Sequence, residues 1–278
     1  MFLSVKNLHH RDLNIKFEEE GHKYTIKNEN ENKENPKKYT SVTTWVHSHF
    51  PHFNADEIIK KMMSGRSWKK GHKYWGLNAE QIKDLWNSKR DNAAGAGTNM
   101  HFEIECFMNS KVLLDYTHRE LYQQYKETEL TSETELTLEW QFFLKFVEDF
   151  PDLKPYRTEW TVYDEDLKLA GSIDMVYENP DGTLSIYDWK RATEINRFNT
   201  WDKYATTECV NHIPDSNYWH YAFQLNAYKA ILERKYNKVV KDLYLVRLHP
   251  DCEDKTYELI KLPDLKKDIN QLFELLLN

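Results

Sequence analysis

Residues 171–190 read GSIDMVYENPDGTLSIYDWK and predict two β-strands, 171–177 and 184–190, joined by a tight Asp-Gly turn. Side chains alternate between the two faces of a strand. Asp188 and Lys190 therefore point the same way, and Trp189 points the other way. We expect this hairpin to bring Asp174, Asp188 and Lys190 together.

Two carboxylates and an ammonium group that converge from paired strands suit a divalent metal ion that handles phosphate. Asp174 and Asp188 would hold Mg²⁺ or Mn²⁺, and Lys190 would position or activate a water molecule. An isolated D-x-K triplet is more often a polar hairpin with a surface salt bridge. Other features of the chain decide between these two interpretations.

The pattern around the hairpin predicts an α+β fold. We expect a single domain over 1–278, with a helix-rich part at 1–150 and a mixed β-sheet, flanked by helices, at 151–278. Expected strands are 22–27, 38–40, 157–164, 168–177, 184–190, 239–248 and 256–262. Expected helices start at Ser41 and near Thr98, and cover 55–63, 79–90, 118–127, 135–149, 218–236 and 263–277. Residues 28–38 are expected to form a polar loop.

The amino-acid composition limits the classes of protein to which this chain can belong. Of the 278 residues 40% are hydrophobic, which is enough for a full core. The net charge of −7 argues against coating nucleic acid over the whole surface, although a local basic groove can still bind it. The three cysteines, scattered and odd in number, suggest a reducing compartment. With neither a signal peptide nor a membrane-spanning run, we expect a soluble intracellular protein, cytoplasmic or at a viral replication site.

Four further features accompany the hairpin. His101 and Glu105 share a helix face, preceded by Gly95 and Gly97, which we expect to allow close backbone approach at the helix N-terminus. The other three are Glu159 in the preceding strand, Gly171 three residues before Asp174, and Gln224 with Tyr228 at i and i+4 on the next helix. Taken alone, each is more often a core, surface or packing residue.

In chain order these features read G-T-x-x-H, E, G-x-x-D, D-x-K and Q-x-x-x-Y. The chain resembles the PD-(D/E)XK nuclease superfamily and, within it, the RecB-like exonuclease branch with its mitochondrial genome maintenance exonuclease-type nucleases. The matching motifs run from Ser41 to Tyr228. The resemblance implies a restriction-endonuclease-like core and metal-dependent hydrolysis of phosphodiesters.

The resemblance also implies roles for individual residues. His101, Asp174, Asp188 and the backbone carbonyl of Trp189 would bind one or two Mg²⁺ or Mn²⁺ ions, and Lys190 would be the catalytic lysine. Glu159 and Gln224 would be supporting catalytic residues, and Tyr228 a substrate contact. The motif's proline is absent, because Ile173 precedes Asp174. The four cysteines of the iron–sulfur relatives are also missing, so we expect no such cluster.

Further substrate contacts are expected outside the metal site. Ser41 and Thr43 begin a helix with an S-V-T segment similar to the mitochondrial-type relatives, and either bind phosphate or act as an ordinary cap. A basic stretch mixed with aromatic residues, which is either a single-strand-binding surface or a solvated loop, contains Lys60, Lys61, Arg66, Trp68, Lys69, Lys70, Lys73, Tyr74 and Trp75. A second basic and aromatic stretch follows the hairpin and contains Arg191, Arg197, Trp201 and Lys203.

These expectations combine into a DNA exonuclease that acts on single-stranded or frayed ends in replication, repair or recombination. A helicase or another replication or recombination protein would be its partner, because the chain lacks a G-x-x-x-x-G-K-[ST] motif. The alternatives are a structure-selective endonuclease on the same fold and a nucleic-acid-binding module without turnover. A weaker alternative is a zinc site at His47, His49 and His52.

Overall fold

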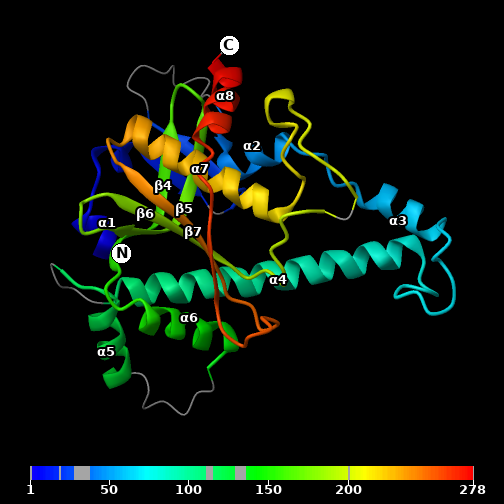
Figure 1. The fold of residues 1–278 in the computed structure, drawn as a ribbon, viewed down its shortest axis with the longest axis horizontal. Helices are drawn as coiled ribbons and strands as arrows, with labels where there is room; N and C mark the ends of the chain where they lie inside the picture. The colour runs from blue at the N-terminus through cyan, green and yellow to red at the C-terminus, as the bar shows by residue number, and fades with distance from the viewer. Residues whose placement is uncertain are drawn as a thin grey trace. The chain divides into compact units, whose positions relative to one another are not determined.

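A six-stranded mixed sheet carries the hairpin, and helices cover it (Figure 1). The computed structural model describes residues 2–18, 20–27, 38–110, 115–128, 136–199 and 201–277, so the predicted polar loop lies, except for Lys38, outside the described residues. The strands of the sheet are β3 (Thr40–Ser41), β4 (Lys154–Asp164), β5 (Leu169–Glu178), β6 (Leu184–Lys190), β7 (Val240–Arg247) and β8 (Glu258–Lys261). A separate antiparallel pair joins β1 (Ile15–Glu18) to β2 (Lys23–Ile26). The predicted α+β class is confirmed.

Strand β5 is the centre of this sheet and has one incompletely paired edge. β4 pairs antiparallel with β5 from Leu169 to Glu178 and so occupies one edge along its whole length. The other edge is shared, because β3 pairs in parallel with residues 169–170 and β6 pairs antiparallel with residues 175–178. Residues 171–174 therefore have no strand partner on that edge among the described residues. Their backbone and side chains are open to groups from elsewhere in the chain.

The remaining elements are helices, most of them close to the predicted ranges. They are α1 (Phe2–Lys6), η1 (His10–Asn14), α2 (Val42–Ser48), α3 (Ala55–Met63), α4 (Ala79–Met108), α5 (His118–Thr128), α6 (Leu138–Asp149), η2 (Glu208–Val210), α7 (Asn217–Lys235) and α8 (Lys266–Leu277). Strand β7 lies parallel to β6, and α7 forms the crossover that a parallel pair requires.

The prediction of two helices between residues 79 and 108 is wrong. Helix α4 continues through Gly95 and Gly97 instead of restarting near Thr98, so neither glycine lies at a helix N-terminus. A Cβ atom at either glycine would meet nothing within 4 Å, so no other described part of the chain approaches the helix closely there. Each glycine costs about 1 kcal/mol relative to alanine, and the intervening alanines are the best helix formers. The helix therefore propagates across the glycines.

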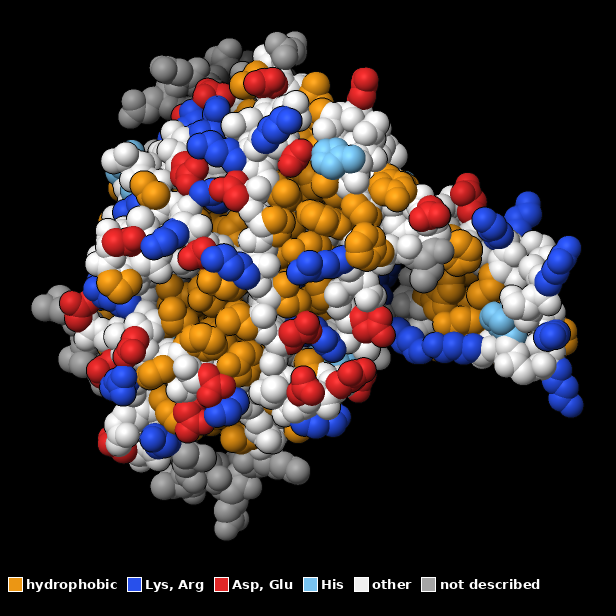
Figure 2. Space-filling model, in the orientation of Figure 1, with side chains coloured by type: hydrophobic (Ala, Val, Ile, Leu, Met, Phe, Trp, Pro, Cys, Tyr) orange, Lys and Arg blue, Asp and Glu red, His pale blue; other side chains and the backbone are white. Residues whose placement is uncertain are grey.

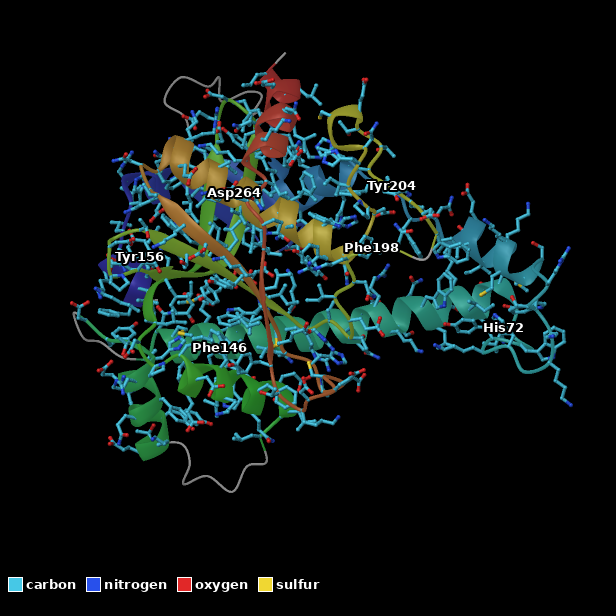
Figure 3. The ribbon with its side chains drawn as sticks, in the orientation of Figure 1. His72, Phe146, Tyr156, Phe198, Tyr204 and Asp264 are labelled. Atoms are coloured by element: carbon cyan, nitrogen blue, oxygen red, sulfur yellow. The ribbon has the colours of Figure 1, made fainter. Side chains whose placement is uncertain are left out.

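Alternation along β6 sends its side chains into two different layers. Leu184 and Ile186 join the hydrophobic core that α7 closes with α2 and α8. Trp189 points away from that core and meets the rings of Phe143 and Phe146 on α6, whose centroids lie 5.7 and 5.6 Å from its own. Phe146 projects from its helix towards the sheet (Figure 3). The sheet is thus packed on both faces, and β6 connects the two layers.

The chain separates into two compact units, residues 1–51 with 101–278 and residues 52–100, and the boundary falls within α4. The first unit contains both sheets. In the second unit, Asn54 caps α3, Ile59 is buried, and the ring of Trp68 lies 5.8 Å from that of Trp75. A single nuclease domain over 1–278 stays a prediction. No helix in the described parts of the chain has the length and apolar character needed to cross a bilayer.

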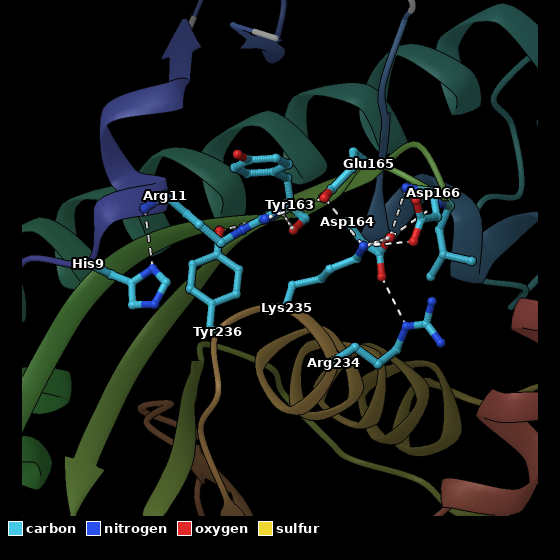
Figure 4. A network of polar contacts seen from close by, with 10 residues as sticks. His9, Arg11, Tyr163, Asp164, Glu165, Asp166, Arg234, Lys235 and Tyr236 are labelled. Atoms are coloured by element: carbon cyan, nitrogen blue, oxygen red, sulfur yellow. Dashed lines mark hydrogen bonds and ion pairs between the residues drawn. The ribbon is translucent and has the colours of Figure 1, made fainter. Parts of the chain in front are cut away.

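A polar network fixes the far end of β4 to the N-terminal segment and to α7 (Figure 4). Asp164 is fully buried and accepts a 3.0 Å hydrogen bond from Nε of Arg234. The guanidinium of Arg11 donates to the carboxylate of Glu165 and to the carbonyl oxygen of Tyr163, and it stacks on the Tyr163 ring at 4.1 Å. A buried carboxylate needs such partners because its unpaired charge would be costly.

We expect the stability of the protein to fall below pH 6.5 because of His118. This side chain is fully buried and hydrogen-bonded to the hydroxyl of Tyr177 at 2.8 Å. Burial lowers the pKa of His118 to about 3. The unfolded chain takes up a proton near pH 6.5 and the folded chain does not, so this contribution to stability is complete above pH 6.5 and is lost progressively towards pH 3.

Urea unfolding at pH 7 and pH 5 checks this expectation. His118→Gln keeps a hydrogen-bonding group but does not titrate. Between the two pH values the wild type should lose about 2 kcal/mol more unfolding free energy than the variant. Equal losses in both proteins would contradict the assignment.

Candidate active site

The β5–β6 hairpin ties its two predicted acidic positions together through the backbone. The carboxylate of Asp174 accepts a 3.0 Å hydrogen bond from the N–H of Trp189. This bond lies where β5 has no strand partner among the described residues. The Asp174 side chain therefore takes the place of the backbone hydrogen bond that a paired strand would make there. The carboxylate of Asp174 is thereby fixed beside the D-x-K segment.

His101 reaches the hairpin from α4 with both ring nitrogens engaged. Its Nε2 lies 2.9 Å from the carbonyl oxygen of Trp189. Because a carbonyl oxygen can only accept, Nε2 carries the hydrogen and donates it. Nδ1 faces the other way and lies 3.6 Å from both Glu159 Oε1 and Asp174 Oδ2. In neutral imidazole this leaves Nδ1 as the nitrogen with a free lone pair.

Glu159 completes a group of three possible metal ligands. The pairs Thr158↔Met175 and Trp160↔Ile173 place Glu159 opposite Asp174. Its backbone φ is +41°, a conformation that is strained for a residue with a side chain, and strain of this kind concentrates at functional sites. Ser172 Oγ donates a 3.0 Å hydrogen bond to Glu159 Oε2 and holds the carboxylate in place.

The donor atoms of this group fit a divalent cation. One ligand atom each from His101, Glu159 and Asp174 lies within 4.8 Å of the others, and among the described residues these three form the group of this kind. Two carboxylate oxygens and one imidazole nitrogen suit Mg²⁺ or Mn²⁺, and the nitrogen favours the transition metal. Asp188 is not part of this group.

Asp188 instead forms an ion pair with Lys190, with 2.6 Å between its Oδ2 and the lysine Nζ. Asp188 is only 2% exposed. The ammonium of Lys190 also lies 4.5 Å from the ring centre of Tyr221 on α7. The prediction that Asp188 and Lys190 share one face of β6, opposite Trp189, is therefore confirmed.

Burial and crowded charge shift the pKa values of these groups. Burial raises the pKa of Asp188 to about 6, and the neighbouring Asp174 adds to this while Lys190 opposes it. Burial raises the pKa of Asp174 as well. Burial alone would lower the pKa of His101, but Asp174, Glu159 and Asp188 raise it to about 9. The carboxylates thus attract positive charge, and protons and a metal ion compete for the same ligand atoms.

A cavity of about 420 Å³ meets the metal group at one residue. Glu159 lines it together with Glu105, Arg157 and residues of the N-terminal segment such as Leu8. His101 and Asp174 are not among its lining residues, so the cavity lies on one side of the ligand group.

Gln224 and Tyr228 lie behind β5, where the missing side chain of Gly171 makes room. Gln224 Nε2 donates to the Tyr228 hydroxyl at 3.4 Å. A Cβ atom at Gly171 would come within 2.6 Å of Tyr228 Cε1 and 2.7 Å of its hydroxyl oxygen. Tyr228 is only 3% exposed, so its ring packs directly on the backbone of β5 three residues before Asp174.

The other predicted substrate contacts are not members of the metal-ligand group found among the described residues. Ser41 Oγ accepts from the N–H of Thr44 at 3.1 Å and so caps α2, while Thr43 is exposed. Arg191 donates to Glu139 at 2.7 Å. Lys69 and Lys70 are exposed in the second unit.

The histidines of the alternative zinc site, His47, His49 and His52, are not part of the metal-ligand group found among the described residues. The ring of His47 lies against His220, and His49 Nδ1 lies 2.8 Å from the hydroxyl of Thr207.

Sequence reasoning missed Tyr221 and Ser172. Tyr221 precedes Gln224 by three residues on α7, a spacing that places both on one helix face. This signal was available in the sequence. Ser172 lies two residues before Asp174 in β5, but nothing in the sequence indicated its bond to Glu159.

Comparison with known proteins gives one family. The family model of the PD-(D/E)XK nuclease superfamily matches residues 77–278, which is more than half of the chain. No curated protein matches the chain.

We expect Gly171→Ala to destabilise the protein, because the new methyl group would displace the buried ring of Tyr228. Overpacking of this kind typically costs about 1–3 kcal/mol of unfolding free energy. Gly97→Ala is the matched control, since a Cβ atom there meets nothing and alanine favours the helix. Urea unfolding should show loss of stability at residue 171 and a gain at residue 97. A neutral Gly171→Ala would refute the contact.

We expect the ring of Tyr221 to hold the ammonium of Lys190, with a cation–π attraction of about 0.5–2 kcal/mol. Tyr221→Phe keeps the ring and should leave kcat nearly unchanged. Tyr221→Leu removes it and should lower kcat about 3- to 30-fold with little change in KM. Steady-state hydrolysis of a DNA substrate measures both. Equal activity of the two variants would exclude this role.

Proposed function

The chain belongs to the PD-(D/E)XK nuclease superfamily, and we propose that it is an exonuclease that degrades DNA from single-stranded or frayed ends. Membership in this superfamily supports metal-dependent hydrolysis of phosphodiester bonds in nucleic acid. Nucleases of the superfamily generally use divalent metal ions. Beyond this shared activity, we propose the type of nucleic acid, the strand end that is attacked and the metal ion that is used.

The observation that carries the proposal is the group His101, Glu159 and Asp174 beside the Asp188–Lys190 pair. A metal ion bound there would polarise the scissile phosphate and lower the pKa of a bound water molecule. Lys190, close to this group on the same hairpin, orients the attacking water or stabilises negative charge on the phosphate oxygens. Asp188 keeps that lysine charged and in place.

The proposed ion is Mg²⁺ or Mn²⁺, with Mn²⁺ favoured by the imidazole ligand. Asp188 and the carbonyl of Trp189 remain proposed ligands of this ion or of a second one, because both belong to the same hairpin segment as Lys190.

The charge distribution supports binding of a nucleic-acid backbone by the second unit. Residues 52–100 contain nine Lys and Arg and five Asp and Glu, a net charge of +4, although the whole chain has −7. Lys69 and Lys70 are exposed there, and so is Trp75, at 48%. Cations that neutralise phosphates and aromatic rings that stack on bases together suit an unpaired strand.

The proposed cellular setting is replication, repair or recombination, with a helicase or related protein as partner. We place the enzyme in a reducing intracellular compartment, the cytoplasm or a viral replication site, because Cys106, Cys209 and Cys252 are all unpaired. We also treat residues 1–278 as one nuclease domain, because the site draws on segments from His101 to Tyr228.

The test compares end-labelled linear single-stranded DNA with its covalently closed circle, in Mg²⁺ or Mn²⁺. The linear form should be degraded and the circle should survive, and EDTA should abolish activity. Lys190→Ala should lower the rate about 10²- to 10⁴-fold. Lys241→Ala, a lysine exposed on β7, is the matched control and should be unaffected.

Cutting of the circle would replace the proposal with an endonuclease. Equal activity of Lys190→Ala and the wild type would remove the hairpin from the mechanism. Binding without metal-dependent loss of DNA or of a parallel RNA substrate would leave only a binding module.

A further inference from the structure

The connection between β6 and α7 exposes three aromatic side chains within seven residues. Phe198 is 76% exposed, Trp201 is 72% exposed and Tyr204 is 46% exposed. Phe198 and Tyr204 lie on the face drawn in Figure 3, and hydrophobic side chains are visible at the surface at the same places in Figure 2. Exposed rings in such close sequence are unusual, because large aromatic side chains gain most from burial.

The same connection does bury other apolar residues. Ala205, Val210 and Ile213 are at most 6% exposed, and Val210 belongs to the main hydrophobic core. These buried residues follow the three rings in the chain, whereas the described residues from Thr193 to Tyr204 are exposed or half-buried. The rings therefore lie on the solvent-facing part of the connection, next to a part that packs into the core.

Hydrogen bonds hold the described parts of the backbone that carries these rings. The amide of Asn199 accepts from the N–H groups of Trp201 and Lys203 and donates to the carbonyl oxygens of Lys203 and Asp215. The indole Nε1 of Trp219 donates to the carbonyl oxygen of Arg197 at 3.0 Å. Rigid positioning lowers the entropy cost of binding a ligand to exposed rings.

Both ends of the connection are attached to the proposed site. It begins directly after Lys190, and Arg247 holds its first carbonyl groups at Ala192 and Thr193. It ends at α7, whose Tyr221 contacts Lys190. Phe198 lies eight positions after Lys190 in the chain, a span of at most about 29 Å, so the first of the rings lies within a short stretch of nucleic acid from Lys190.

Positive charge accompanies the rings. Arg197 and Lys203 are exposed on either side of Trp201, with one carboxylate, Asp202, between them. Rings that present a π-face and cations that follow the phosphates recognise unpaired nucleotides without reading their sequence. An apolar partner surface would not need these cations.

We infer that Phe198, Trp201 and Tyr204 form a stacking platform for the unpaired bases of a single-stranded DNA bound at the Asp174–Lys190 site. The inference rests on the proposed function for the identity of the ligand. The platform gives the site its preference for single strands, because paired bases in a duplex cannot offer their faces to the rings.

The test measures binding of fluorescent single-stranded DNA in EDTA, so that no strand is cut. The oligonucleotide is compared with one of equal length that lacks its bases. The wild type should bind the abasic strand at least ten-fold more weakly, since stacking is worth about five- to a hundred-fold per base. A Phe198→Ala, Trp201→Ala, Tyr204→Ala variant should bind the intact strand at least ten-fold more weakly than the wild type does, and its affinity for the abasic strand should be unchanged.

Two control proteins isolate stacking from other causes. Leucine at the same three positions keeps apolar area without a π-face and should behave as the alanine variant does. Val239→Ala with Leu275→Ala removes exposed apolar groups elsewhere, 63% and 56% exposed, and should change neither affinity. The inference is overturned if the triple alanine variant keeps wild-type affinity, or if it loses the same factor on the abasic strand.

Hydrolysis of the abasic strand by the wild type with Mn²⁺ separates this inference from the proposed function. This strand has phosphodiester bonds but no bases, so its cleavage depends on the metal site and not on stacking. If the wild type cuts neither the abasic strand nor DNA, the proposed function fails, while the binding data in EDTA still decide the inference.

Discussion

The hydrogen bond from the Trp189 N–H to the Asp174 carboxylate is the interaction on which the site depends. It exists because, in the part of the chain that the structure describes, β5 has no strand partner between Ala170 and Met175 on the edge that β3 and β6 share. In a fully paired sheet that edge would be filled by backbone groups. The gap lets an acidic side chain bond to the neighbouring strand and lets His101 reach the carbonyl of Trp189.

The same gap explains why charge can be buried here. Asp188 is 2% exposed, and both its burial and the neighbouring Asp174 raise its pKa. Lys190 and His101 supply the compensating positive charge from a strand and a helix. Such a site is unfavourable for folding unless every charge has a partner, and a divalent cation would add one more. The sheet core around it, packed by α6 on one face and α7 on the other, provides the rigidity that holds these groups at short range.

Much of the fold could be predicted because it follows from local periodicity. The alternation in 184–190 predicted β6 and its two faces, and the helical pattern of residues 218–236 predicted α7. The helix restart near Thr98 was wrong, because two glycines weaken a helix without ending it when alanines surround them. The strand β1, the short helix α1 and the ion pair of Arg11 with Glu165 were not predicted, because they are stabilised by β4 and the residue that follows it, more than 130 residues away in the chain.

The sequence by itself determined which chemical groups are available and which neighbours along one element share a face, because strand and helix geometry convert spacing into direction. It therefore specified Asp188 with Lys190, and His101 with Glu105. Only the tertiary structure decided that Glu159 faces Asp174 with a strained backbone, that Tyr221 lies under Lys190, and that Tyr228 fills the space over Gly171. Each of these contacts joins two different elements of the fold. Spacing along the sequence does not give the distance between residues on different elements, because that distance is set by how the whole core packs.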